Sequence, residues 1–372
     1  MNIVQYVKQY GNKKFSEFPF NEVDALIFSE LSYMNFDMYI KDMHFISLKK
    51  LKILDKKNFY FGSVDAYDNR RLLEAMQKSK RYGDVKAGFC RSYIDTHKQN
   101  YMQFFAMTLI MPDRTAFISY RGTDISILGW KEDLYLAYQA SMPGQERAVN
   151  YLKEATTLFT GGFYVGGHSK GGNLAIYSAL HMGKKLEKRL IKGYSFDGPG
   201  FKKDISHMES YQRINHKLEK FLTTHDMIGV IYNKAQNPKI VYSNGILLGG
   251  HDPFFWSVGR YTGTFNYAKD RSIDSKNSEE ALMNWLENES EESKKLAVHI
   301  LFSIFGESRT IYDVLLNASR LIANRKHLFD DYTQEEKEQA KEIYRRLGRY
   351  YLTSYSPKRF LMRLTKGSDK NK

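Results

Sequence analysis

A single serine stands at the centre of a glycine-rich turn, in the sequence GGHSKGG over residues 166–172. The apolar run 163–167 before it predicts a strand, and residues 170–184 after it predict a helix. The spacing G-x-S-x-G between a strand and a helix is typical of a nucleophile elbow, whose sharp turn exposes the serine hydroxyl and leaves no room for neighbouring Cβ atoms. The pattern predicts Ser169 as a nucleophile. The alternative is a glycine-rich turn that happens to contain a serine.

A serine nucleophile needs a base, and the base needs an acid that orients it. His251 is the expected base because it lies in a glycine-rich loop after the last predicted strand, and the chain order in α/β-hydrolases is Ser, Asp or Glu, His. Asp226 and Asp197 each follow a predicted strand. We expect Asp226 to orient His251, since neighbouring strand ends lie roughly 5 Å apart, and we expect Asp197 to bond within its own Asp-Gly-Pro-Gly turn.

Strands and helices alternate around these residues. The apolar runs 103–111 and 115–120 predict a strand pair, followed by the further strands 191–196, 218–224 and 239–243. Helical spacing occurs at 22–35, 67–80, 144–159 and about 202–216. Short apolar strands separated by helices indicate an α/β fold with a mostly parallel central sheet covered by helices. From about residue 275 the pattern is helical only, with a Thr333-x-x-Glu336 capping box. We therefore expect a domain over 1–274 and a helical C-terminal region over 275–372.

Several motifs together resemble a known family. The elbow GGHSKGGNLAIYSA, the segment ISYRGTD (118–124) and GWKEDL (129–134) are similar to the class 3 lipases. With FDGPGF (196–201) and NEVDALIFSELSYMNF near the start, the chain more closely resembles the bacterial Mbeg1-like proteins, over about residues 20–260. The resemblance implies an α/β-hydrolase fold and an esterase or lipase activity on a small-molecule or lipid ester, without a cofactor.

The oxyanion hole is expected to use backbone amides. The amide of Lys170 follows the nucleophile directly, and the resemblance implies that Thr123 supplies the second amide. Arg121 is expected to be structural, tied to Asp133 or to carbonyls at the strand end. Lys170 replaces an apolar residue of the lipases, so a cation is expected at the opening of the site, compensated by Asp124 or by an anionic substrate.

Composition narrows the partners. The net charge is +14, and residues 344–372 contribute nine cations against one aspartate. This basic tail could bind an anionic membrane, and the alternative function is a non-catalytic hydrolase-fold protein that binds a membrane or a protein partner through its C-terminal helices. No nucleic-acid motif accompanies the charge, and neither zinc-protease nor phosphate-loop spacing occurs. With one cysteine and no apolar run of membrane-spanning length, we expect a cytoplasmic protein without a metal.

Overall fold

The computed structural model describes residues 1–41, 43–61, 65–97, 101–124, 126–235, 237–245, 248–305 and 332–354. The chain divides into two compact units, Met1–Asp270 and Arg271–Lys372, and each is described by itself. Residues 355–372 lie outside the described residues. They make up most of the basic tail, for which membrane binding is predicted.

The first unit is built on one sheet of nine strands, ordered as in the sequence. The strands are β1 (Phe45–Ser47), β2 (Lys86–Asp95), β3 (Met102–Ile110), β4 (Ala116–Tyr120), β5 (Phe163–His168), β6 (Leu190–Phe196), β7 (Leu218–Thr223), β8 (Lys239–Val241) and β9 (Tyr267–Ala268). The strands from β4 to β8 pair in parallel, whereas β1 to β4, and β8 with β9, pair antiparallel. The predicted mostly parallel sheet is confirmed as the centre of an α/β-hydrolase fold; β1, β2 and β9 were not predicted.

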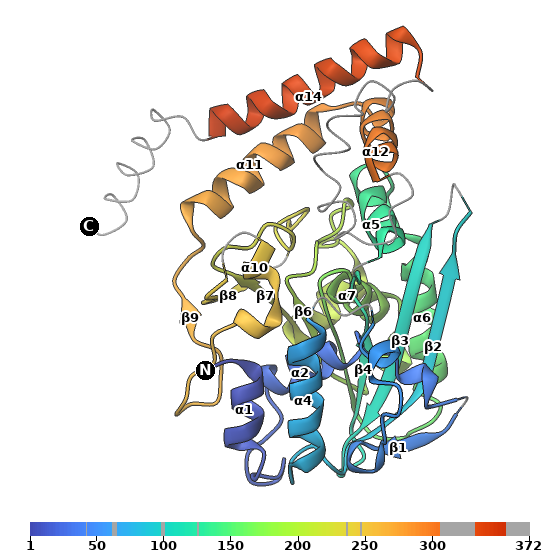
Figure 1. Cartoon of the computed structure of the whole chain (residues 1–372), viewed down its shortest axis with the longest axis vertical. Helices are drawn as coiled ribbons and strands as arrows, with labels where there is room; N and C mark the ends of the chain where they lie inside the picture. Colours follow the sequence, from blue (N-terminus) through green and yellow to red (C-terminus); the bar gives the residue numbers. More distant parts are fainter. Residues whose placement is uncertain are drawn as a thin grey trace. The chain divides into compact units, whose positions relative to one another are not determined.

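In the first unit, helices are interleaved with the strands along the chain, and they cover the sheet (Figure 1). The helices of the first unit are α1 (Ile3–Tyr10), α2 (Glu22–Leu31), α3 (Lys56–Phe59), α4 (Ala66–Lys78), α5 (Ile127–Leu134), α6 (Pro143–Ala155), α7 (Lys170–His181), α8 (Lys184–Glu187), α9 (Glu209–Ile214) and α10 (Leu248–His251). Short 3-10 helices are η1 (Phe36–Met38), η2 (Leu48–Lys50), η3 (Tyr135–Ala137), η4 (Asn215–Lys217) and η5 (Pro253–Phe255). The expected helices 22–35 and 67–80 correspond to α2 and α4. The expected helix 202–216 is shorter, because only α9 is α-helical there.

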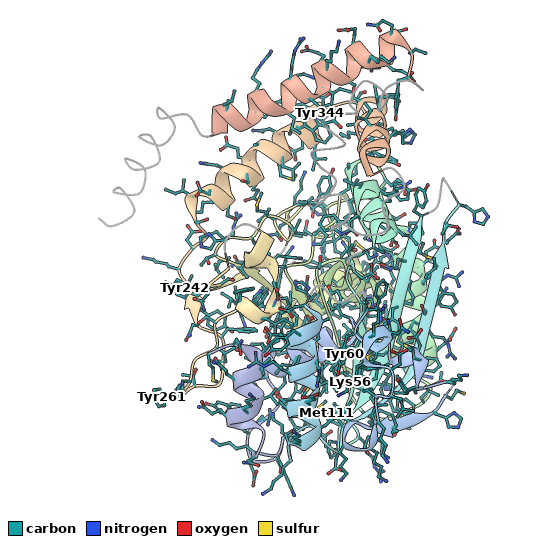
Figure 2. The ribbon with its side chains drawn as sticks, in the orientation of Figure 1. Lys56, Tyr60, Met111, Tyr242, Tyr261 and Tyr344 are labelled. Atoms are coloured by element: carbon teal, nitrogen blue, oxygen red, sulfur yellow. The ribbon has the colours of Figure 1, made fainter. Side chains whose placement is uncertain are left out.

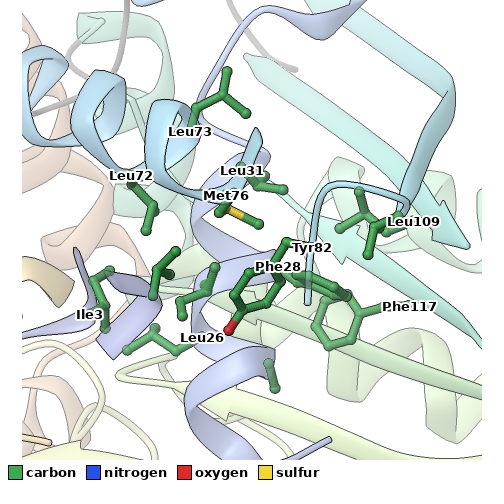
Figure 3. Close-up of a cluster of buried hydrophobic side chains, with 14 of the residues drawn as sticks. Ile3, Leu26, Phe28, Leu31, Leu72, Leu73, Met76, Tyr82, Leu109 and Phe117 are labelled. Carbon is green, nitrogen blue, oxygen red and sulfur yellow. The ribbon is translucent and has the colours of Figure 1, made fainter. Parts of the chain in front are cut away.

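The two faces of the sheet hold separate hydrophobic cores, because side chains alternate along each strand. Phe117 of β4 packs into one core with α1, α2 and α4. The next residue, Ile118, packs into the other core with α6 and α7. Figure 3 shows the first core, in which Leu26, Phe28 and Leu31 of α2 lie among residues of α1, α4 and the sheet. The N-terminal helices are therefore an integral layer of the fold.

Buried polar contacts fix α2 within that layer. Asn21 caps the helix, and its side chain accepts from the amides of Val23 and Asp24 at 2.9 and 3.2 Å. The Asp24 carboxylate is fully buried, accepts from Arg81 Nε at 2.9 Å and also bonds the Tyr82 hydroxyl. A buried charge of this kind is tolerated when it is paired and hydrogen-bonded. These contacts hold α2 in place, and its C-terminal end leads to the functional site.

In the second unit, the described residues 271–305 and 332–354 are mostly helical. This unit contains α11 (Ile273–Asn288), α12 (Glu291–Phe305) and α14 (Gln334–Ser354). The predicted capping box is present, since Thr333 N donates to Glu336 Oε2 at 2.8 Å and Glu336 N donates to Thr333 Oγ1 at 3.2 Å. Arg346 of α14 forms a two-pronged pair with Glu289, at 2.6 and 2.8 Å, so α14 is tied to the end of α11. Tyr344 of the same helix is labelled in Figure 2 and donates to the Ala297 carbonyl of α12 at 3.1 Å.

None of the helices in the described part of the chain is both long enough and apolar enough to span a membrane.

Candidate active site

Ser169 lies between β5 and α7, in a backbone conformation that few residues adopt. Its φ and ψ are 56° and −132°, and it is the N-cap of α7. Its amide donates to the Phe196 carbonyl at the end of β6, at 2.8 Å. A positive φ at a residue with a side chain costs energy and persists only where the surrounding structure enforces it. The structure has the predicted strand–turn–helix geometry, and the backbone of the turn is strained at Ser169.

The two glycines of the motif permit this turn. A Cβ on Gly167 would collide with the backbone of Gly171 and lie 2.7 Å from the Tyr120 carbonyl oxygen. A Cβ on Gly171 would collide with the same carbonyl. The end of β4 therefore passes against both sides of the elbow, and only glycine fits at either position.

The Ser169 hydroxyl has no structural hydrogen-bond partner in the described part of the chain. The residue is 8% exposed, and its hydroxyl makes no hydrogen bond to any residue that the structure describes. The first amides of α7 follow it directly, and amides in the first turn of a helix have no partner within the helix. They carry a partial positive charge, which favours an anion at this position.

His251 ends the short helix α10 and is bonded to an aspartate, but not to the one we expected. Its Nδ1 lies 3.2 Å from Asp197 Oδ2, and its side chain is 19% exposed. The prediction that Asp226 is this partner, and that Asp197 bonds within its own turn, is wrong. Asp197 has a φ of 47°, and its Oδ1 accepts from Thr223 N of β7 at 3.0 Å.

Asp226 has the role that we had assigned to Asp197. Its Oδ1 accepts from the amides of Ile228 and Gly229, both at 3.0 Å, so it stabilises the turn after β7. The prediction assumed that the loop after β8 stays near its own strand. Instead the loop reaches back towards β5, where the His251 carbonyl accepts from His168 at 2.8 Å. Because β6 pairs with β5, Asp197, which directly follows β6, lies close enough to bond the His251 imidazole.

Burial shapes the protonation of this site. It lowers the pKa of His251 below its usual 6.5, although the nearby charges of Asp226, Asp252 and Asp133 act in the opposite direction. Burial, followed by the charge of Asp197, raises the pKa of Asp226 to about 7. Burial also raises the pKa of Asp133 and of Asp252 to about 6. A neutral imidazole with a free Nε2 lone pair is the form that can accept a proton.

Lys170 does not place a cation at the opening of the site. Its side chain is 1% exposed, and its Nζ donates to Glu132 Oε2 of α5 at 2.6 Å and to the Gln103 carbonyl at 3.0 Å. Burial acts to lower the pKa of Lys170, but the charges of Glu132 and Asp133 outweigh it, so the pKa lies above its usual value. The expected compensation exists, but Glu132 provides the hydrogen bond rather than Asp124 or a substrate.

The segment with Arg121 and Thr123 passes directly beside the nucleophile. A Cβ on Gly122, between them, would lie 3.1 Å from Ser169 Cβ. The Thr123 hydroxyl donates to Asp133 of α5. Arg121 is structural, as expected, since it bonds the Ser32 carbonyl and, at 3.0 Å, the Met34 carbonyl. Its partners are carbonyls that follow α2; no ion pair with Asp133 forms among the described residues.

A buried amide on the elbow helix holds the turn that carries Asp197. Asn173 Nδ2 donates to the carbonyls of Pro199 and Gly200 at 3.1 and 2.8 Å. Its Oδ1 accepts from Gln145 of α6 at 2.7 Å. The motifs GGHSKGGN and FDGPGF are therefore parts of one hydrogen-bonded unit, a connection that sequence reasoning missed.

His168 and Tyr33 are further residues that sequence reasoning missed. His168 lies within the elbow motif, but we considered only histidines downstream of Ser169 as partners. Tyr33 belongs to the segment NEVDALIFSELSYMNF, which was noted only as part of the resemblance. The Tyr33 hydroxyl lies 3.0 Å from His168 Nδ1, and both residues are buried.

One group of side chains in the described part of the chain could contact a cation. Ligand atoms of Asp197, Asp226 and His251 lie within 4.8 Å of one another. The same grouping results when a base is placed beside its orienting carboxylate and a second aspartate, so it does not by itself indicate a metal.

Comparisons with known proteins identify the family of the chain. The model of the Mbeg1-like family matches residues 76–303. A solved structure described as "Crystal structure of M37 lipase" has a TM-score of 0.39 and 15% identity, over 57% of this chain and 71% of the other. None of the curated proteins matches the chain. The family match spans the elbow, the Asp197 turn and the His251 loop, and the chain belongs to the Mbeg1-like family.

Proposed function

We propose that the protein is a serine hydrolase that cleaves carboxylic esters. The observation that carries this proposal is the strained Ser169 at the start of α7, in the same site as an imidazole bonded to a buried carboxylate. A glycine-rich turn without a function has no need of a positive φ at its serine, nor of a His–Asp pair beside it.

In the proposed reaction, Ser169 Oγ attacks the acyl carbonyl carbon and its proton passes to His251 Nε2. Asp197 bonds Nδ1–H, keeps the imidazole in the correct tautomer and stabilises the imidazolium. The amides of Lys170 and Thr123 stabilise the tetrahedral oxyanion. The imidazolium then protonates the leaving alkoxide, and a water molecule, activated by the same base, releases the acid from the acyl-enzyme.

The apo geometry is compatible with this sequence of steps. Ser169 Oγ makes no hydrogen bond to a described residue, and catalytic hydrogen bonds commonly tighten only when substrate binds. No cofactor takes part in the proposed reaction. An ester of a small molecule or of a lipid is the proposed substrate class.

Labelling with a fluorophosphonate probe tests the proposal. The native protein should be labelled once, at Ser169, and Ser169→Ala should not be labelled. Ser178→Ala is the matched control, because Ser178 lies in the same helix, is fully buried and bonds the Ala175 carbonyl at 2.9 Å. The same variants should keep or lose hydrolysis of short p-nitrophenyl esters as they keep or lose labelling. Labelling that persists in Ser169→Ala, or a native protein that is never labelled, would refute the assignment.

A further inference from the structure

The ring of His168 makes two hydrogen bonds. Its Nδ1 lies 3.0 Å from the Tyr33 hydroxyl, and its Nε2 lies 2.8 Å from the His251 carbonyl oxygen. The residue is 5% exposed, and its ring centroid lies 4.4 Å from that of His251. The nucleophile's own neighbour in sequence is therefore bonded to the backbone of the proposed base.

The direction of these bonds follows from the chemistry of the groups. A carbonyl oxygen can only accept, so Nε2 of His168 must carry the hydrogen. Burial, followed by the charge of His251, holds the pKa of His168 well below 6.5, so the ring is neutral and its Nδ1 is an acceptor. Burial holds the pKa of Tyr33 well above 10, so its hydroxyl remains a donor. The chain runs from Tyr33 to His168 to His251.

Two independent contacts therefore fix His251. His168 holds its backbone carbonyl, and Asp197 holds its ring through Nδ1. A base held only at its ring could still tilt with the backbone of its loop. A misplacement of about 1 Å in a reacting group can cost about 100-fold in rate. Holding the carbonyl removes that freedom.

The Tyr33 end of the chain is itself firmly placed. Tyr33 follows α2 directly, between Ser32 and Met34, whose carbonyls bind Arg121. A Cβ on Gly122 would collide with the Tyr33 hydroxyl, so this hydroxyl also borders the segment beside the nucleophile. Residues 32–34 therefore contact both the oxyanion side and the base side of the site. They lie before residue 76, where the family match begins.

We propose that Tyr33 and His168 are positioning residues, which hold the backbone of His251 against the nucleophile elbow through a directed chain of hydrogen bonds. This inference rests on the proposed ester hydrolysis. It adds that the helical layer before residue 76 is required for full catalytic activity and not only for folding.

The test is a set of variants of the full chain, assayed for kcat and KM with a p-nitrophenyl ester and for the rate of fluorophosphonate labelling. His168→Leu removes both bonds and should lower kcat and the labelling rate at least tenfold, with KM changed less than twofold. His168→Gln offers an amide donor near the position of Nε2 and should recover to within about threefold of native. The side chain of asparagine is shorter, so the amide of His168→Asn should not reach the His251 carbonyl, and this variant should behave as His168→Leu.

Tyr33→Phe removes the donor that selects the Nε2–H tautomer and should lower kcat several-fold. In the His168→Leu background the same change should have no further effect, because the chain is already broken. Tyr151→Phe is the matched control, since Tyr151 is also buried and its hydroxyl donates to the Phe89 carbonyl at 2.7 Å, with no contact to His251. It should leave kcat unchanged.

The outcomes separate the two proposals. If the native protein is labelled at Ser169 but His168→Leu and His168→Asn keep native kcat, the positioning role is wrong and the proposed function stands. The role is also wrong if His168→Gln is as impaired as His168→Asn, or if Tyr33→Phe costs the same in both backgrounds. If the native protein is not labelled, the proposed function fails and the positioning role fails with it. Circular dichroism confirms that each variant is folded before it is scored.

Discussion

Asp197 Oδ2 lies 3.2 Å from His251 Nδ1. Asp226 is nearer to His251 along the chain, because only β8 lies between them, but it does not make this hydrogen bond. The two aspartates share one buried region with the imidazole, within 4.8 Å of each other, but their hydrogen bonds differ. Asp197 bonds Thr223 of the adjacent strand and the imidazole, whereas Asp226 bonds the amides of its own turn. The orienting acid of the proposed triad is therefore Asp197.

The two asparagine variants should separate these roles. In Asp197→Asn the amide NH₂ can donate to Nδ1. This favours the tautomer with the proton on Nε2, which cannot accept the serine proton, so kcat should fall by roughly 10³ to 10⁴-fold. Asp226→Asn keeps an oxygen for the amides of Ile228 and Gly229, so kcat should stay within about tenfold of native. Both are measured with a p-nitrophenyl ester at pH 8. The reverse order of severity would contradict the assignment.

Asp226 should also make stability depend on pH. Burial, then the charge of Asp197, raises its pKa in the folded state to about 7, from the usual 3.8 of an aspartate. The folded protein therefore binds this proton more tightly than the unfolded chain, so its contribution to stability is full below the unfolded pKa and is lost as the pH rises towards 7. Asp226→Asn cannot ionise.

The variant should therefore be more stable than the native protein at pH 8, by about 1 to 3 kcal/mol, and this advantage should shrink by pH 5. Urea unfolding at the two pH values measures the difference. Asp113→Asn provides the comparison, since Asp113 is exposed and bonds only the amide of Thr115 among the described residues. An advantage for Asp226→Asn that is equal at both pH values would argue against a buried, protonated carboxyl.

The protonation of His251 sets the acid limb of the rate profile. Catalysis needs the neutral imidazole, and burial lowers its pKa below 6.5 despite the surrounding carboxylates. Activity should therefore fall with decreasing pH through a midpoint below 6.5, and kcat/KM at pH 6.5 should exceed half of its maximum. With a pKa of about 7, Asp226 is mostly protonated at this midpoint, so Asp226→Asn should leave the midpoint nearly unchanged. A native midpoint above 6.5, or a shift to higher pH in the variant, would show that another group controls this limb.

The sequence predicted local features of the site better than features that depend on how loops run. The elbow at Ser169 could be predicted because its strain, its glycines and its helix lie within a few residues. The choice of Asp197 over Asp226 depends on the path of the loop after β8, which no local pattern encodes. Strand β2 was missed because its residues KAGFCRSYID mix exposed and buried positions, with a bulge after Gly88. The bond from His168 to His251 joins residues 83 positions apart and follows only from the assembled fold.

The buried pair of Lys170 and Glu132 gives the last prediction. Both side chains are at most 1% exposed, and Nζ and Oε2 lie 2.6 Å apart, so removing one charge leaves the other unpaired in the interior. Lys170→Met should therefore destabilise the protein by about 3 to 5 kcal/mol. Lys170→Met with Glu132→Gln removes both charges and keeps an acceptor for the Gln103 amide, which bonds Glu132 Oε2 at 3.0 Å. The double variant should recover more than half of the loss.

The control is Lys192→Met, which breaks a pair in which Lys192 is 42% exposed and should cost about 1 kcal/mol or less. Urea unfolding of the native protein and the three variants measures these differences. A double variant as unstable as Lys170→Met would mean that packing of the lysine stem, rather than the unpaired charge, sets the cost.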